Sequence, residues 1–266
     1  QTLTNWELIL IDDGSTDNAV DSISDISDPR IRIIRQENSG KPAAMNRALA
    51  EVRGEFYALQ DADDLSRPER LERQSACLRE HPDVAGVFCG HEVILDGRVL
   101  APTFRAKSAQ QCAGEIRAAL MPAHDPTAMY RMSMVREFRY SEDLPVVEGV
   151  DYVIRVGEQH PVMVLGECLY SYRVHSESVT QKNADRRIAL LEEAIARMRA
   201  RRGRPMTDDD RRRLRRSLDR GRDDNDLVSH FCTSVADLIE AGQRSTALGV
   251  GWVSFTRKPA DPYYAK

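Results

Sequence analysis

Two apolar segments of this chain each end directly in a group of aspartates, which strongly limits the folds it can adopt. The segments are residues 6–11 and 56–59. Short apolar runs that stop at a turn are typical of buried strands in a parallel sheet. The aspartates that follow them are Asp12 and Asp13 after the first run and Asp61, Asp63 and Asp64 after the second.

Between the two runs, the pattern predicts a helix at residues 17–26, a strand at 31–35 and a helix at 43–52. This β-α-β-α-β alternation indicates a parallel sheet covered by helices. Ligands of such open sheets bind at the carboxyl ends of the strands, so we expect both acidic groups to face one site.

Beyond the second acidic group, helical and strand patterns continue, with no clear assignment at residues 98–121. We expect a helix at 68–80, a strand at 84–95, a turn at 96–97, and helices at 186–202, 208–220 and 227–241. The C-terminal part is rich in arginine. We therefore predict two regions, a catalytic domain at residues 1–182 and a mainly helical C-terminal region at 183–266.

Composition excludes several classes of protein. The 266 residues are 41% hydrophobic and 30% charged, as in a folded globular protein. No apolar run approaches the roughly 20 residues that span a bilayer, and no secretory signal is recognisable, so the expected location is cytoplasmic. The formal net charge of −4 argues against a general nucleic-acid coat. The scattered Cys77, Cys89, Cys112, Cys168 and Cys232 predict neither disulfides nor a zinc site.

Asp61-Ala62-Asp63 is a D-x-D sequence directly after a predicted strand. Two carboxylates in this position provide the hard oxygen ligands that Mg²⁺ or Mn²⁺ prefers beside a diphosphate. An ordinary acidic turn explains an isolated D-x-D equally well. The neighbouring segments decide between these two explanations.

Six segments, in this order and spacing, resemble the family 2 glycosyltransferases. They are residues 9–17, 38–46, 59–64, 125–131, 148–155 and 172–180. The resemblance covers roughly residues 1–180. It implies an α/β fold of the GT-A (Rossmann-like) type, with a mostly parallel sheet flanked by helices. It also implies a metal-dependent, inverting transferase that uses a nucleotide-sugar donor, with UDP as the expected nucleotide.

The resemblance also implies roles for individual residues. Asp13 contacts the nucleotide base, supported by Asp12, while Lys41 lies near the base or the phosphates. Asn38 in the second segment is a further donor-binding residue. Asp61 faces the ribose and Arg173 contacts the diphosphate. Asp63 and His175 hold Mn²⁺ or Mg²⁺, which neutralises the charge that develops on the leaving diphosphate.

Inversion in one step needs a general base for the acceptor hydroxyl. The family places an aspartate directly after a glutamate, whereas this chain has Glu148-Gly149-Val150-Asp151. Asp151 is our preferred base and Glu148 the second choice, since residues three apart share a helix face. Alternatively, Asp151 only pairs with Arg155 on the helix surface. The segment 124–127 is explained equally well as an acceptor-pocket wall or as a proline turn.

Relatives begin with an additional strand and helix, so the first strand of the fold is expected to be missing here. With Gly149, this supports a rival hypothesis, a degenerate member that binds a nucleotide sugar or a partner protein without catalysis. A sugar-nucleotide nucleotidyltransferase is a second rival, although its glycine-rich phosphate loop is not seen. The expected acceptor is a saccharide or lipid-linked sugar of cell-envelope polysaccharide synthesis. The arginine run at 211–216 predicts either a solvated helix face or peripheral contact with the inner membrane face.

Overall fold

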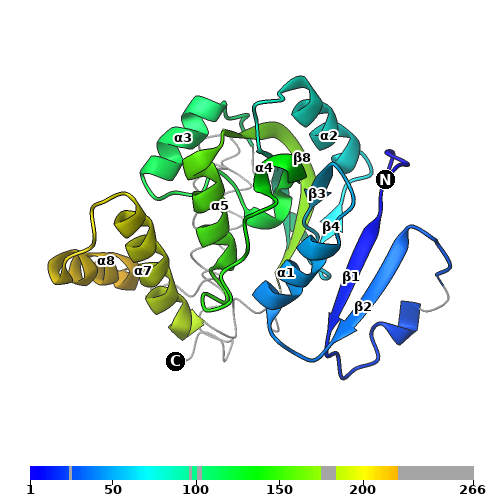
Figure 1. Cartoon of the computed structure of the whole chain (residues 1–266), viewed down its shortest axis with the longest axis horizontal. Coiled ribbons are helices and arrows are strands. Elements are labelled where there is room, and N and C mark those ends of the chain that lie inside the picture. The colour runs from blue at the N-terminus through cyan, green and yellow to red at the C-terminus, as the bar shows by residue number, and fades with distance from the viewer. Residues whose placement is uncertain (24–25, 96–97, 101–103, 175–183, 221–266) are drawn as a thin grey trace.

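The computed structural model describes residues 1–23, 26–95, 98–100, 104–174 and 184–220 (Figure 1). The strands are β1 (Leu8–Asp13), β2 (Ile31–Gln36), β3 (Phe56–Ala58), β4 (Leu65–Ser66), β5 (Gly86–Leu95), β6 (Arg98–Leu100), β7 (Met129–Arg131) and β8 (Val162–Val174). The helices are η1 (Asp21–Ile23), α1 (Lys41–Glu51), α2 (Arg70–Glu80), α3 (Ala109–Arg117), η2 (Asp125–Thr127), α4 (Met132–Val135), α5 (Glu148–Gln159), α7 (Ala184–Arg201) and α8 (Asp208–Arg220).

The predicted α/β alternation at the N-terminus is confirmed by the first strands and by α1. β1 and β2 pair in parallel from Leu8 opposite Ile31 to Asp13 opposite Gln36. Both strands therefore end at the same edge, beside the start of α1. The sequence prediction that acidic residues gather at a strand edge is correct for β1.

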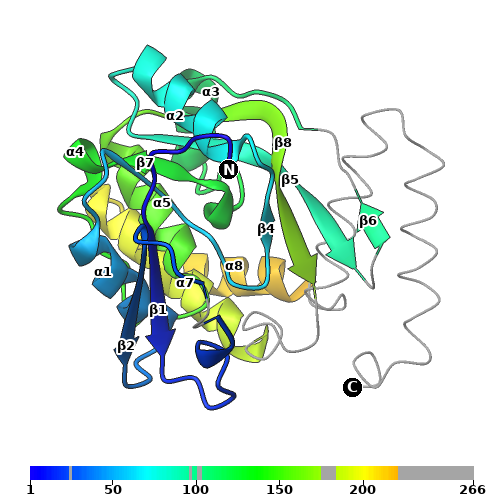
Figure 2. The same cartoon turned by 90° about the vertical axis from the view of Figure 1, so that its right-hand side faces the viewer.

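The second sheet is mixed, whereas the sequence predicted mostly parallel pairing. Its order is β3-β7-β5-β8-β4, with β6 also paired to β5. β5 and β8 run parallel and side by side (Figure 2), but β3, β4, β6 and β7 all pair in the antiparallel direction. The antiparallel strands β3, β4, β6 and β7 are only two or three residues long, and apolar runs of that length carry no signal for pairing direction.

The predicted helix at residues 17–26 is also wrong within its described part, where only η1 forms. Asp17 and Ser22 explain the difference, because their side chains bond to nearby backbone groups. The Asp17 carboxylate accepts from the N–H of Ala19, and the Ser22 hydroxyl donates to the Ala19 carbonyl. Such local bonds compete with a regular helix. Asn18, with φ of 57°, adds a left-handed turn.

α5 occupies the centre of the main core. Its residues Tyr152, Val153, Ile154 and Val156 are buried. Tyr152 stacks on Tyr140 with ring centroids 4.1 Å apart, and its hydroxyl lies 2.6 Å from that of Tyr57. Strand β3 and the loop before α5 are therefore locked to the same helix.

α7 packs on the side of α5 that faces away from the sheet (Figure 1). Met198 of α7 belongs to the main core, and Ala194 packs with Leu144 and Val147. The predicted helices at 186–202 and 208–220 are confirmed. The predicted domain boundary at 182/183 and the helix at 227–241 lie outside the described residues. No helix in the described part of the chain is both long and apolar enough to cross a membrane.

Candidate active site

The loops after β1 and β2 touch each other at the strand edge. An oxygen of Asp12 accepts a hydrogen bond from the Ser15 N–H at 2.9 Å. Bonds from Ser15 lower the pKa of the Asp12 carboxyl, so the carboxylate is stabilised. Gly14 has a φ of 77°, and a Cβ there would lie 2.9 Å from the backbone nitrogen of Asn38. This close approach requires glycine and places Asn38 beside the β1 loop.

Asp13 holds the loop that leads into α1. Its Oδ1 accepts hydrogen bonds from the side chain of Gln36 at 2.8 Å and the N–H of Ser39 at 2.9 Å. Its Oδ2 accepts from the N–H of Gly40 at 2.9 Å. One carboxylate therefore fixes the two residues directly before Lys41, the first residue of α1.

Lys41 lies among carboxylates of the loop after β3, of η2 and of α5. Its ammonium lies 2.9 Å from Asp61. Burial alone would lower the pKa of Lys41, but the negative charges of Asp61, Glu148 and Asp125 outweigh that effect and raise it. The structure thus brings Lys41 and Asp61, two of the proposed donor-site residues, near Glu148, the second candidate for the base, and near Asp125.

Asp64, for which the sequence predicted no individual role, anchors the loop after β3. It is only 6% exposed, and burial raises the pKa of its carboxyl to about 6. The Tyr170 hydroxyl donates to Oδ2 at 2.8 Å, and the Arg173 N–H donates to Oδ1 at 2.8 Å. The N–H of Asp61 in turn donates to the Tyr170 hydroxyl oxygen at 3.2 Å. β8 therefore positions Asp61 through Tyr170. The backbone of Arg173, the predicted diphosphate contact, lies next to Asp64.

Glu148 and Asp125 form the inner wall of the site. Glu148 is 6% exposed and Asp125 is 9% exposed. Burial raises the pKa of Glu148, and it raises that of Asp125 to about 7. Val146, two residues before α5, has a φ of 74°, which a β-branched residue adopts only under strain. Strain of this kind is concentrated at functional sites in proteins.

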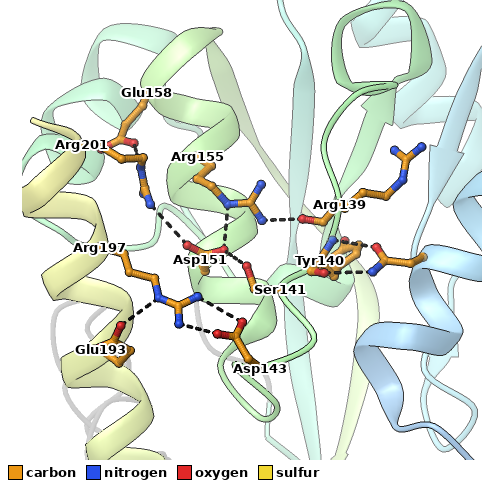
Figure 3. Close-up of polar contacts among 11 residues, drawn as sticks. Arg139, Tyr140, Ser141, Asp143, Asp151, Arg155, Glu158, Glu193, Arg197 and Arg201 are labelled. Carbon is orange, nitrogen blue, oxygen red and sulfur yellow. Dashed lines mark hydrogen bonds and ion pairs between the residues drawn. The ribbon is translucent and has the colours of Figure 1, made fainter.

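Asp151 lies on α5 but is not brought together with Lys41 and Asp61. Its Oδ2 accepts hydrogen bonds from the Ser141 hydroxyl at 2.6 Å and from Arg155 at 2.7 Å (Figure 3). Arg201 of α7 lies 3.6 Å from Oδ1. With a side chain 1% exposed, Asp151 is held in an ion-pair network between α5 and α7.

The predicted metal ligands are only partly described. Asp63 is exposed at the tip of the loop after β3, whereas His175 lies outside the described residues. In the described part of the chain, no three His, Cys, Asp or Glu side chains converge as a complete metal site. Oxygen ligands from Asp63 and a bound diphosphate remain a chemically suitable set for Mg²⁺ or Mn²⁺, since these sites are often shared with substrate phosphates.

A ring of aromatic and imidazole side chains lies next to Asp125. The rings of His124 and Tyr172 are 4.8 Å apart, and those of His124 and His91 are 5.2 Å apart. This cluster gives the segment 124–127 a wall of flat side chains, which neither sequence interpretation of that segment included.

Comparison with known proteins agrees with this arrangement. The family model described as glycosyl transferase family 2 matches residues 1–139. The candidate glycosyltransferase EpsE of Bacillus subtilis (strain 168) is 33% identical over 198 residues, which cover 69% of this chain and 68% of EpsE. A further relative, EpsH of the same organism, is 27% identical over 195 residues, and the aligned part covers 68% of this chain but 56% of EpsH. The chain thus spans little more than half the length of some relatives.

The solved structures that resemble this fold include TarS of S. aureus in complex with UDP. That structure, of TarS residues 1–349, has a TM-score of 0.54 and 20% sequence identity, and the match covers 71% of this chain and 56% of the TarS fragment. The Escherichia coli UDP-Glc:alpha-D-GlcNAc-diphosphoundecaprenol beta-1,3-glucosyltransferase WfgD is 33% identical over 107 residues, 38% of this chain and 42% of WfgD. The match over more than half of the chain, together with the fold, shows that this protein belongs to glycosyl transferase family 2 and has the GT-A fold.

Proposed function

We propose that this glycosyltransferase moves a sugar from a UDP-sugar to an acceptor hydroxyl with inversion at the anomeric carbon. One observation carries the proposal: the Lys41 ammonium, at the end of the loop after β2, pairs with Asp61 of the loop after β3 at 2.9 Å. In the proposal, carboxylates that act on this cation serve donor binding and proton transfer. Family membership supplies the reaction class, and UDP and UDP-GlcNAc in the TarS structures support a nucleotide-sugar donor.

In this proposal the β1 and β2 loops receive the nucleotide. Asp12, Asp13 and Asn38 line the strand edge, and Asp61 is placed for the ribose. The internal bonds of Asp13 to Ser39 and Gly40 support such a role, since they fix the backbone of a loop that must meet a flat base.

The diphosphate lies, in this proposal, between Lys41 and Arg173. The donor's leaving group gains negative charge as the bond to the sugar breaks, and fixed positive charges stabilise that change. A Mg²⁺ or Mn²⁺ ion held by Asp63, with His175 as the second proposed ligand, supplies further Lewis-acid stabilisation when bound.

The acceptor is proposed to be a saccharide or a lipid-linked sugar in cell-surface polysaccharide synthesis. The name of WfgD, which describes transfer to a diphosphoundecaprenol-linked sugar, supports this class.

Contact of the arginine run with the inner membrane face stays a prediction. In the described part of α8, Arg211 pairs with Glu192, while Arg212 and Arg213 pair with Asp209. These pairs reduce the positive field that a membrane would meet.

A second candidate function is nucleotide-sugar binding without transfer, and Gly149 favours it because the family's usual base is absent there. The two candidates differ in one observable. A degenerate member binds UDP but releases none from a UDP-sugar, whereas an active transferase does both.

Calorimetric titration of UDP and of GDP into the purified chain, with and without Mn²⁺, tests the donor site. We expect UDP to bind more tightly than GDP and binding to strengthen with Mn²⁺. Asp63→Ala should remove the effect of Mn²⁺, and Asp209→Ala on α8 serves as the exposed-carboxylate control. Absence of UDP binding at millimolar concentration would contradict the proposal.

A further inference from the structure

The side chain of Asp125 occupies the space that a side chain at position 149 would fill. A Cβ built on Gly149 would lie 2.5 Å from Oδ2 of Asp125, 2.8 Å from its Cγ and 2.9 Å from its Cβ. No side chain fits at position 149 while Asp125 keeps this position. The glycine and the aspartate are therefore complementary: position 149 lacks the carboxylate expected in the family, and Asp125 brings a carboxylate to the same place.

The backbone around Asp125 is held from α2 by two fully buried polar side chains. Arg70 donates to the carbonyls of Pro126 at 2.8 Å and Ala128 at 3.3 Å. Gln74 donates to the carbonyl of Thr127 at 2.8 Å. These groups are 1% and 0% exposed, respectively, so the η2 turn has little freedom to move. Such rigid support suits a reacting group, because small displacements of that group lower the reaction rate strongly.

Charged and titratable groups face Asp125 from several elements. They are Lys41 of α1, Asp61 of the loop after β3, Glu148 of α5 and the Tyr130 hydroxyl of β7, with Tyr140 and Tyr152 nearby. Tyr130 lies 3.4 Å from Oδ1. Lys41 favours the ionised form of Asp125, whereas burial and the two other carboxylates oppose it. Their balance leaves a carboxyl with a pKa of about 7, a suitable value for a general base near neutral pH.

We propose that Asp125 is the general base of this transferase and replaces the aspartate that Gly149 lacks. The inference rests on the proposed function. Its Oδ2, which points at Gly149, takes the proton from the acceptor hydroxyl. As that O–H bond breaks, the acceptor oxygen forms a bond to the anomeric carbon. The bond from that carbon to the donor phosphate breaks, and its electron pair leaves with the nucleoside diphosphate.

Glu148 and Asp151 are less suited to this role in the structure. Oε2 of Glu148 is enclosed and has no hydrogen-bond partner among the described residues, so an acceptor hydroxyl cannot reach it without rearrangement. Asp151 faces away from the Lys41 site: Ser141 and Arg155 bond to its Oδ2, and Arg201 lies 3.6 Å from its Oδ1. Glu148 instead acts as a positioning residue, because its negative charge helps to raise the pKa of Asp125.

The test measures UDP binding by calorimetry and UDP release from UDP-glucose and UDP-N-acetylglucosamine, with water as the acceptor. Asp125→Asn keeps the size of the side chain and removes its basicity. We expect it to bind UDP within about threefold of the wild type and to lose at least about 100-fold in kcat, the usual range for a lost general base. The matched control is Glu92→Gln. Glu92 is a buried carboxylate of β5 that pairs with Arg67, and its variant should keep both UDP binding and UDP release.

The outcomes distinguish a wrong role for Asp125 from a wrong proposed function. If the wild type releases UDP and Asp125→Asn keeps more than a tenth of kcat, the inference is wrong while the proposed function stands. Loss of UDP binding in Asp125→Asn would make Asp125 a donor-binding residue and would also overturn the inference. A wild type that binds UDP but releases none contradicts the proposed function. Thermal unfolding checks that each variant folds, and if Asp125→Asn does not fold, Asp125→Ser replaces it.

Discussion

Buried carboxylates on and beside α5 are in two opposite electrostatic situations. On the side of the helix that faces α7, Asp151 has a hydroxyl and two arginines around it (Figure 3). At the N-terminal end of the helix, Glu148 and Asp125 share the ammonium of Lys41 with Asp61. The first arrangement satisfies its charge, and the second does not. Buried carboxylates whose charge is under-compensated are the ones expected at a functional site.

This difference also separates stability from chemistry. The pKa values of Asp125 and Glu148 are raised, which means that folding disfavours their ionised forms. The strained φ of Val146, two residues before α5, adds to the energetic cost at this end of the helix. Proteins retain such costs mainly where function requires them.

The largest expected effect comes from moving the carboxylate between positions 125 and 149. Asp125→Gly should lower the rate of UDP release at least about 100-fold. Adding Gly149→Asp to this variant should raise the rate of UDP release at least about tenfold, because the new side chain enters the space that Asp125 leaves. The control is Asp125→Gly with Gly149→Asn, which fills the space without a base. Equal recovery in both double variants would show that position 125 acts only through packing.

Lys41→Met is expected to weaken UDP binding by roughly 10- to 100-fold, the range for a lost hydrogen bond to a charged group. Calorimetry measures it directly. Arg47→Met, on the exposed side of the same helix, is the control and should bind UDP like the wild type. Unchanged UDP binding in Lys41→Met would mean that Lys41 does not contact the bound nucleotide.

Asp151→Asn should lower the free energy of unfolding by about 2 kcal/mol, or roughly 4–8 °C in Tm, because Arg155 and Arg201 lose a buried partner. Chemical denaturation and thermal scans measure the two quantities. Asp143→Asn removes an exposed partner of Arg197 and should change stability by less than about 1 kcal/mol. Equal destabilisation by both variants would contradict a special role for the buried site.

We also expect stability to depend on pH through Asp125. Since the folded pKa of Asp125 is about 7 and its unfolded value is near 3.9, the folded protein binds more protons between these values. Stability therefore falls as pH rises from about 4 to 7. Urea unfolding across this range should show a shallower fall in Asp125→Asn, because that variant lacks the titrating carboxyl. A parallel pair of curves would mean that Asp125 does not titrate in this window.

Much of the N-terminal half could be predicted from sequence because strand-length apolar runs there end in aspartates. This pattern predicted β1, β2 and α1. The ion pair of Lys41 with Asp61 was not predicted and comes from the structure alone. Helix α3 was missed, although Ser108 and Gln111 form a capping box that sequence can signal. The mixed pairing of the sheet was also missed, because strands as short as β4 carry too few residues to specify a partner.

The base could not be assigned from sequence because position 125 and position 149 are far apart in the chain. Residue spacing favoured Asp151, which shares α5 with Glu148. The contact between Gly149 and Asp125 joins η2 to α5, and only the folded arrangement reveals it. A missing side chain at one position and an additional carboxylate at another would be the paired signal to search for.

The most direct test measures UDP release and Tm on two purified variants, Asp125→Asn and Asp151→Asn, at pH 8. We expect Asp125→Asn to lose at least about 100-fold in rate with an equal or higher Tm. We expect Asp151→Asn to lose several degrees in Tm, while its rate per folded molecule falls less than tenfold. The reverse pattern, with the rate lost in Asp151→Asn and kept in Asp125→Asn, would contradict the separate roles of the two carboxylates.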